Sequence, residues 1–85
     1  MAAVTIYSSD WCGFCRRAKS LLQARQADIT EINVDGDPAA RREMEQRSGR
    51  RTVPQIWIGE QHIGGCDDLY ALERSGKLDA MLAAE

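Results

Sequence analysis

Two cysteines stand three positions apart in the segment Cys12-Gly13-Phe14-Cys15, where a short apolar run gives way to an amphipathic one. A pair with this spacing at the start of a helix is typical of thiol–disulfide exchange, because the helix dipole favours a thiolate on the first cysteine. Cys12 precedes the predicted helix and is expected to be the exposed nucleophile. Cys15 lies about one turn further on and is expected to be a shielded, protonated resolving thiol. The pair therefore predicts redox chemistry.

Two other uses of the cysteine pair stay open at the level of the sequence. A structural disulfide between the two would close a loop too short to constrain the unfolded chain strongly. A zinc site would draw its ligands from Cys12, Cys15, Cys66 and His62, but the spacing of the last two is unlike the second short knuckle of a structural zinc site. His62, the only histidine, is expected to be an exposed strand residue instead.

Length and composition predict one small domain, residues 1–85, that is 44% hydrophobic and 28% charged like ordinary soluble proteins. The formal net charge of -2 gives no basic footprint for nucleic acid or an anionic membrane, and no apolar run approaches the roughly 18 residues of a membrane span. Three cysteines are an odd number, which fits reduced thiols better than a disulfide framework. Because a strand pattern follows Met1-Ala2-Ala3 directly, in place of a signal peptide, a cytoplasmic location is expected.

The apolar pattern predicts the element order β-α-β-α-β-β-α, followed by a short closing helix. The expected strands are residues 4–7, 29–34, 55–58 and 61–64, and the expected helices begin at Cys15, at Pro38, near Cys66 and at Leu78. Gly49 and Ser75-Gly76 are placed to end the second and third helices. A right-handed crossover makes the first two strands parallel, and the final hairpin adds antiparallel strands. The prediction is an α/β fold with a mixed four-stranded sheet and helices on both faces.

Three motifs follow one another along the chain: Cys12-Gly13-Phe14-Cys15, Thr52-Val53-Pro54 and Gly64-Gly65-Cys66-Asp67-Asp68. In order and spacing they resemble the glutaredoxin family, in its bacterial class I dithiol type, and the resemblance covers nearly the whole chain. It implies a thioredoxin fold with a cis peptide bond before Pro54, an isomer found in only about 5–6% of X-Pro bonds. Pro54 would lie against the thiols, and the backbone N–H and C=O of Val53 would face an extended peptide such as glutathione.

The same resemblance implies a glutathione site beside the cysteine pair. Its expected residues are Phe14, Arg51, Thr52, Val53, Pro54, Gly65, Cys66 and Asp67. Arg51, with Gln46 as a second candidate, would hold the glycyl carboxylate. The backbone N–H groups of Cys66 and Asp67 at a helix start suit the γ-glutamyl carboxylate, since the paired glycines before them allow close approach. The carboxylate of Asp67 would take the ammonium group.

Two segments depart from the family pattern. Ser9-Asp10-Trp11 stands where many members have a lysine before the first cysteine, so the helix terminus and Arg16 are expected to activate Cys12 instead. Trp11 is expected to form an exposed lip of the site. Gly13-Phe14 replaces the proline and tyrosine of many dithiol members and resembles monothiol members, in which the first cysteine and glutathione hold a [2Fe-2S] cluster across a dimer. Cluster binding, with Cys12 as the metal ligand, therefore stays open as a second function.

The predicted function is the reduction of protein–glutathione mixed disulfides and protein disulfides, with glutathione as reductant and no metal required. Cys12 would attack the disulfide, and Cys15 would resolve the intermediate formed with intramolecular protein disulfides. The expected partners are glutathione and glutathionylated or disulfide-containing proteins, and neither nucleic acid nor membrane. A monomer is expected, with a dimer only where a cluster is bound.

Overall fold

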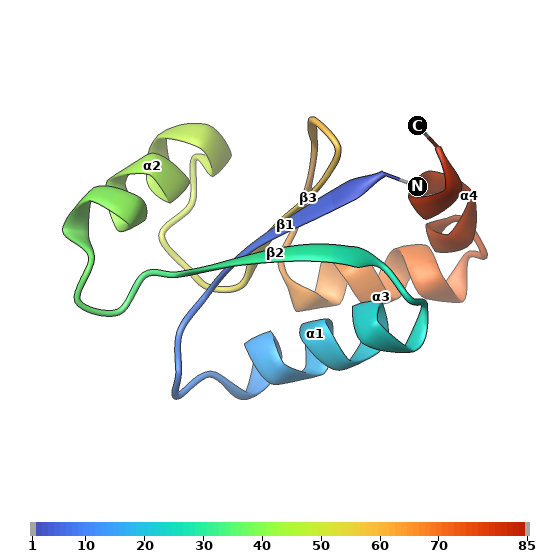
Figure 1. Cartoon of the computed structure of the whole chain (residues 1–85), viewed down its shortest axis with the longest axis horizontal. Helices are drawn as coiled ribbons and strands as arrows, with labels where there is room; N and C mark the ends of the chain where they lie inside the picture. The colour runs from blue at the N-terminus through green and yellow to red at the C-terminus, as the bar shows by residue number, and fades with distance from the viewer. Residues whose placement is uncertain (1, 85) are drawn as a thin grey trace.

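The computed structural model describes residues 2–84 and consists of a four-stranded sheet with helices on both faces (Figure 1). The strands are β1 (Ala3–Ser8), β2 (Asp28–Asn33), β3 (Gln55–Ile58) and β4 (Gln61–Gly64). The helices are α1 (Gly13–Ala24), α2 (Pro38–Ser48), α3 (Cys66–Arg74) and α4 (Leu78–Ala83). The thioredoxin-like fold with its mixed sheet is confirmed, and so is the short closing helix.

The strand order β2-β1-β3-β4 places β1 in the interior of the sheet. β1 runs parallel to β2, and α1 makes the crossover between them. β1 runs antiparallel to β3, so its carboxyl end lies beside the start of β3, with Tyr7 opposite Gln55. This pairing brings two loops to the same end of the two strands. The loop after β1 carries Cys12, and the loop before β3 carries Thr52-Val53-Pro54.

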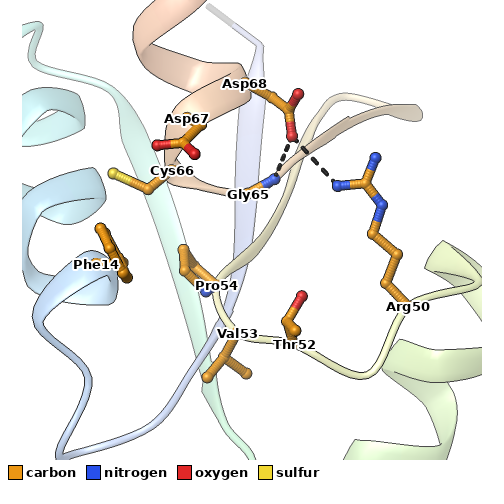
Figure 2. A pocket seen from close by; sticks show the side chains of 9 residues that line it. All are labelled: Phe14, Arg50, Thr52, Val53, Pro54, Gly65, Cys66, Asp67 and Asp68. Atoms are coloured by element: carbon orange, nitrogen blue, oxygen red, sulfur yellow. Dashed lines mark hydrogen bonds and ion pairs between the residues drawn. The ribbon is translucent and has the colours of Figure 1, made fainter.

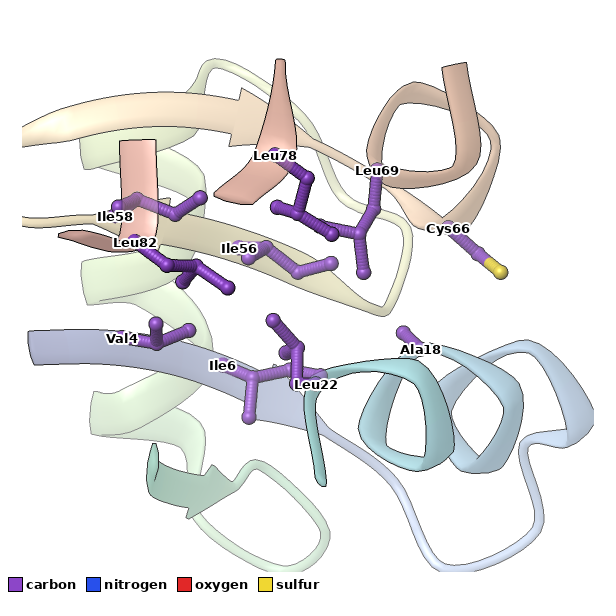
Figure 3. Close-up of a cluster of buried hydrophobic side chains, with 10 residues drawn as sticks. All are labelled: Val4, Ile6, Ala18, Leu22, Ile56, Ile58, Cys66, Leu69, Leu78 and Leu82. Carbon is purple, nitrogen blue, oxygen red and sulfur yellow. The ribbon is translucent and has the colours of Figure 1, made fainter. Parts of the chain in front are cut away.

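The larger hydrophobic core lies between the sheet and the helices α1, α3 and α4 (Figure 3). Because side chains alternate along a strand, Val4 and Ile6 of β1 join Ile56 and Ile58 of β3 on this face. The helices complete the cluster with Ala18, Leu22, Cys66, Leu69, Leu78 and Leu82. The middle and the C-terminal part of α1 are therefore packed into the same core as Cys66 at the start of α3.

Among residues 2–84, α2 is the helix that covers the opposite face of the sheet. Tyr7, Val34, Met44 and Trp57 form its small core, and Met44 is the only buried residue of α2. Arg47 adds a polar attachment: its guanidinium lies 4.4 Å from the ring centroid of Trp57 and donates a hydrogen bond of 2.9 Å to the hydroxyl of Tyr7. A cation over an aromatic face contributes on the order of 1 kcal/mol. The helix is lightly buried, as expected, and the contacts of Arg47 with Trp57 and Tyr7 add to its attachment to the sheet.

Most element boundaries agree with those expected. Pro38 begins α2, and Gly49, with a φ of 72°, ends it in the left-handed conformation. α1 begins at Gly13, two residues before the expected Cys15, because the side chain of Cys12 caps the helix. β2 starts and ends one residue earlier than the expected strand 29–34. These shifts change which residue ends an element and leave the topology unaltered.

Candidate active site

Cys12 occupies the N-cap position of α1, with extended backbone angles of φ -127° and ψ 105°. Its Sγ accepts a hydrogen bond of 3.1 Å from the backbone N–H of Cys15 and lies 3.7 Å from the carbonyl oxygen of Val53. The first N–H groups of a helix have no intrahelical acceptor, so a sulfur here satisfies one of them and lies at the positive end of the dipole. The sulfur of Cys12 thus lies at the helix start and is partly exposed, as a nucleophile that attacks a disulfide must be; its activation stays a prediction.

Cys15 lies one turn into α1 and is fully buried. Burial raises the pKa of its thiol to about 12, and the hydrogen bond with Cys12 acts in the same direction. A thiol with so high a pKa stays protonated at neutral pH and is not the attacking group. The two cysteines are therefore unequal, in the sense predicted from their positions at the helix start.

The loop that carries Cys12 is held by Asp35, which follows β2. Asp35 accepts hydrogen bonds of 2.8 Å from the hydroxyl of Ser9 and from the backbone N–H of Asp10. The bond from the Asp10 N–H, followed by that from Ser9, lowers the pKa of the Asp35 carboxyl. Arg16, expected to support Cys12, donates to the carbonyl of Asp10 at 3.4 Å and so contacts the same loop. Its effect on the reactivity of Cys12 stays a prediction.

A cavity of about 300 Å³ opens beside the cysteine pair (Figure 2). Its lining residues are Phe14, Arg50, Thr52, Val53, Pro54, Gly65, Cys66, Asp67 and Asp68. Three separate segments of the chain contribute: the start of α1, the loop before β3, and the start of α3. The cavity has the size of small-ligand sites in proteins.

Seven of the eight residues expected at the glutathione site line this cavity, and the bond between Val53 and Pro54 is cis, as the resemblance implied. Arg51 is the exception. Its side chain is 90% exposed, and its Nε lies 3.3 Å from Oε1 of Glu45 on α2. The neighbouring Arg50 lines the cavity in its place, and Gln46 is exposed and outside the lining. The role of Arg51 toward a carboxylate stays a prediction, with Arg50 as a second cation that the sequence did not single out.

Arg50 and Asp68 form one rim of the cavity. Oδ2 of Asp68 accepts a hydrogen bond of 2.9 Å from the backbone N–H of Gly65 and lies 3.3 Å from Nη1 of Arg50 (Figure 2). The Gly65 N–H, and after it Arg50, lowers the pKa of the Asp68 carboxyl. The sequence placed Asp68 in the first turn of a helix, but its contacts with Gly65 and Arg50 at the rim of the cavity were not predicted. The spacing Gly65-x-x-Asp68, typical of a helix N-cap with an acidic residue at N3, is the signal that could have found it.

The paired glycines have different roles. Gly64 has a φ of 118°, and a Cβ built there would lie 2.3 Å from Oδ2 of Asp68. Gly65 has an ordinary φ of -94°, and its Cβ would meet only the carbonyl oxygen of Pro54 at 3.5 Å. Gly64 is therefore the glycine that leaves room for the Asp68 carboxylate, and the close approach of a ligand carboxylate to the pair stays a prediction.

Aromatic side chains flank the cysteine pair on the outside. Trp11 is 96% exposed and Phe14 is 57% exposed, so both present apolar surface next to Cys12. The expected exposure of Trp11 is confirmed, whereas Trp11 is not among the residues that line the cavity and its place as a lip of the site stays a prediction. Cys66, the third cysteine, is buried at the start of α3, and burial raises the pKa of its thiol.

The zinc alternative finds no support in residues 2–84, where no three His, Cys, Asp or Glu side chains gather into a metal-binding group. His62 lies on a strand, β4, as expected, but the expectation that it is exposed was wrong. His62 is half-buried, stacks on Trp57 with ring centroids 4.7 Å apart, and makes a 2.8 Å hydrogen bond with the side chain of Gln55. Pairing of β3 with β4 places His62 opposite Trp57, a contact that strand periodicity alone does not predict.

A thioredoxin fold with a capping thiol, a buried thiol one turn further on and a Val53-Pro54 loop beside them defines a dithiol redox protein. The sequence model of the glutaredoxin family matches residues 4–63. The chain belongs to the glutaredoxin family, and it is accordingly a thiol–disulfide oxidoreductase.

Similarity to known glutaredoxins extends along the whole chain. Glutaredoxin of Pseudomonas aeruginosa is 58% identical over 84 residues, which is 99% of this chain and 100% of that protein. Glutaredoxin 3 of Escherichia coli is 55% identical over 82 residues, 96% and 99% of the two chains. The solution structure of a Brucella melitensis glutaredoxin has a TM-score of 0.85 at 54% identity, covering 96% of this chain and 89% of that one. The crystal structure of a buckwheat glutaredoxin–glutathione complex has a TM-score of 0.85 at 38% identity, covering 93% and 74%.

Membrane insertion of a helix is not indicated by the fold. Within residues 2–84, every helix is too short or too polar to cross a bilayer.

Proposed function

We propose that this chain uses glutathione to reduce protein–glutathione mixed disulfides and protein disulfides, through Cys12. The observation that carries the proposal is the position of the Cys12 sulfur. It caps α1 and lies 3.7 Å from the carbonyl oxygen of Val53, a residue that lines the 300 Å³ cavity. A ligand in the cavity would thus have a nucleophilic sulfur beside it. The glutathione bound by the buckwheat relative supports glutathione as the occupant.

The monothiol reaction needs only Cys12. Its thiolate attacks the glutathione sulfur of a mixed disulfide, a new S–S bond forms between Cys12 and glutathione, and the protein thiol leaves with the electron pair and takes up a proton. The thiolate of a second glutathione then attacks the glutathione sulfur on Cys12. Glutathione disulfide is released, and Cys12 returns as the thiolate.

The dithiol reaction uses Cys15 as well. After Cys12 has attacked a protein disulfide, Cys15 loses its proton and attacks the Cys12 sulfur, which releases the reduced protein and leaves a Cys12–Cys15 disulfide. Two glutathiones reduce this bond and leave as glutathione disulfide. The high pKa of Cys15, about 12, supports a role restricted to this second step, because Cys15 cannot compete with Cys12 for the first attack.

Glutathione would lie across the three segments that line the cavity. The backbone N–H groups of Cys66 and Asp67, at the start of α3, suit the γ-glutamyl carboxylate, and the carboxylate of Asp67 suits the ammonium group. The backbone of Val53 would pair with the peptide as an added strand does. Arg51 or Arg50 would hold the glycyl carboxylate; Arg50 is supported by its place in the lining.

Three further properties belong to the proposal. All three cysteines are free thiols, which supports a reducing compartment, and we infer the cytoplasm. Residues 1–85 would act as a single domain, and as a monomer. A [2Fe-2S] carrier function is not favoured, because the curated relatives at 58% and 55% identity are glutaredoxins.

The test compares Cys12→Ser with Cys15→Ser on a glutathionylated protein, with glutathione, glutathione reductase and NADPH as the coupled readout. Cys12→Ser is expected to fall to the uncatalysed rate, and Cys15→Ser to retain turnover. On an intramolecular protein disulfide, Cys15→Ser is expected to stall as a mixed disulfide. Activity of Cys12→Ser at the wild-type rate would overturn the proposal.

A further inference from the structure

A chain of hydrogen bonds connects β4 to the loop that forms one wall of the cavity. Gln55, at the start of β3, is fully buried, and its Nε2 donates to the carbonyl oxygen of Thr52 at 3.0 Å and contacts the Thr52 hydroxyl at 3.2 Å. Its Oε1 lies 2.8 Å from Nε2 of His62. Thr52 lines the cavity, whereas Gln55 and His62 lie outside the lining.

The carbonyl oxygen of Thr52 determines the direction of every hydrogen bond in this series. A carbonyl oxygen only accepts, so the amide nitrogen of Gln55 must face Thr52, and its amide oxygen must face His62. His62 must then donate from Nε2, which selects the tautomer with the proton on that nitrogen. Burial, and after it Arg50, lowers the pKa of His62, so the neutral ring persists at neutral pH.

Besides its hydrogen bond with Gln55, the His62 ring contacts Trp57. Its ring lies on Trp57, with centroids 4.7 Å apart and planes inclined by 34°, and Trp57 in turn carries the guanidinium of Arg47 at 4.4 Å. These contacts leave the imidazole little freedom to rotate. The donor that reaches Gln55 is therefore preorganised by the small core beneath α2.

We propose that His62 and Gln55 are positioning residues for glutathione: His62 orients the amide of Gln55, and Gln55 holds Thr52 and the Val53 backbone in the conformation that pairs with the ligand. The inference rests on the proposed function, because it assigns these residues to the same cavity. Neither side chain contacts the reacting sulfur. Their loss should weaken ligand binding and leave the reactivity of Cys12 unchanged.

Two substitutions of His62 separate the hydrogen bond from the packing. His62→Phe keeps a ring on Trp57 and removes the donor, whereas His62→Gln keeps an amide donor at a similar reach and removes the ring. The KM for a glutathionylated peptide is expected to rise roughly three- to tenfold in His62→Phe, the effect of one lost hydrogen bond, and to stay near the wild-type value in His62→Gln. In both variants kcat and the rate of Cys12 alkylation by iodoacetamide are expected to be unchanged.

A third variant and a second readout keep the test independent of folding defects at position 62. Gln55→Glu has the shape of glutamine but cannot donate to the Thr52 carbonyl when ionised, and it is expected to raise KM at least as much as His62→Phe. Amide hydrogen exchange of Val53, measured without ligand, should become faster in both. Gln61→Ala, an exposed neighbour on β4, is the control and should change neither quantity.

Two outcomes would overturn the inference. An unchanged KM in His62→Phe and Gln55→Glu would show that the loop keeps its conformation without the bonds. A rise in His62→Gln with none in His62→Phe would assign the effect to ring packing. Failure of the proposed function is distinguishable, because wild-type protein would then show no activity on the glutathionylated peptide.

Discussion

The Sγ of Cys12 accepts a hydrogen bond of 3.1 Å from the backbone N–H of Cys15, so the main chain of the second cysteine stabilises the sulfur of the first. The side chain of Cys15 meanwhile points into the protein and is fully buried. A spacing of three residues at a helix start thus produces two thiols with opposite properties. One sulfur is partly exposed and receives a hydrogen bond, and the other is withdrawn from water.

This inequality predicts selective alkylation. At pH 7 iodoacetamide is expected to modify Cys12 alone, because a thiol with a pKa of about 12 has a thiolate fraction about a thousandfold below that of an ordinary cysteine. Cys66, buried and with a raised pKa, should also be spared. Mass spectrometry of the native protein should find one adduct, and none in Cys12→Ser. Comparable rates at Cys15 would contradict the assigned burial.

The Asp68 carboxylate predicts a pH-dependent stability. Its folded-state pKa is lowered by the Gly65 N–H and by Arg50, so its contribution is complete above the ordinary value of about 3.9 and is lost as the pH falls through the lower folded value. Asp68→Asn should therefore reduce the free energy of unfolding at pH 7 and make less difference at pH 3, measured by urea denaturation.

Asp67→Asn is the matched control for Asp68→Asn. Asp67 lies on the same first turn of α3 and shares the helix dipole, but the described residues give it no hydrogen bond or ion pair. Its substitution should cost less at pH 7. A loss in Asp68→Asn of the same size at every pH would show that the charge of Asp68 is not used.

Gly64 and Gly65 are expected to respond differently to alanine. Gly64→Ala places a Cβ 2.3 Å from Oδ2 of Asp68 at a φ of 118°, a conformation that costs a residue with a side chain about 1–3 kcal/mol. Gly65→Ala meets no contact closer than 3.5 Å and should change the free energy of unfolding much less. Equal losses of stability in thermal and urea unfolding would refute the conclusion that Gly64, and not Gly65, lies too close to Asp68 for a side chain.

The larger core predicts a strong dependence on Leu22. Leu22 of α1 is fully buried in the cluster that includes Ile6 and Ile56 (Figure 3). Leu22→Ala should lower the free energy of unfolding by about 2–5 kcal/mol through lost burial and the cavity left behind. Gln23→Ala, the exposed neighbour on the same helix, should change it by less than about 0.5 kcal/mol. A loss below about 1 kcal/mol in Leu22→Ala would mean that the core relaxes around the deletion.

Local patterns were sufficient for the element order. Apolar alternation, the caps at Pro38 and Gly49 and the turn before Gln61 are properties of neighbouring residues, and each element appears where its pattern lies. The unequal roles of the two cysteines were also predictable, because a helix places residues three apart one turn along its axis. The limits of α1 and β2 differ by one or two residues, since capping by the Cys12 side chain depends on the folded loop.

The amino-acid sequence by itself determined the dithiol at a helix start, the glycines that allow the turn before α3 and the order of the strands and helices along the chain. Only the tertiary structure decided that Arg50 lines the cavity and Arg51 pairs with Glu45, because an irregular loop has no period from which to infer side-chain direction. It also decided that His62 reaches Gln55, since that contact depends on the pairing of β3 with β4. Contacts between strands follow from register, and register is a property of the folded sheet.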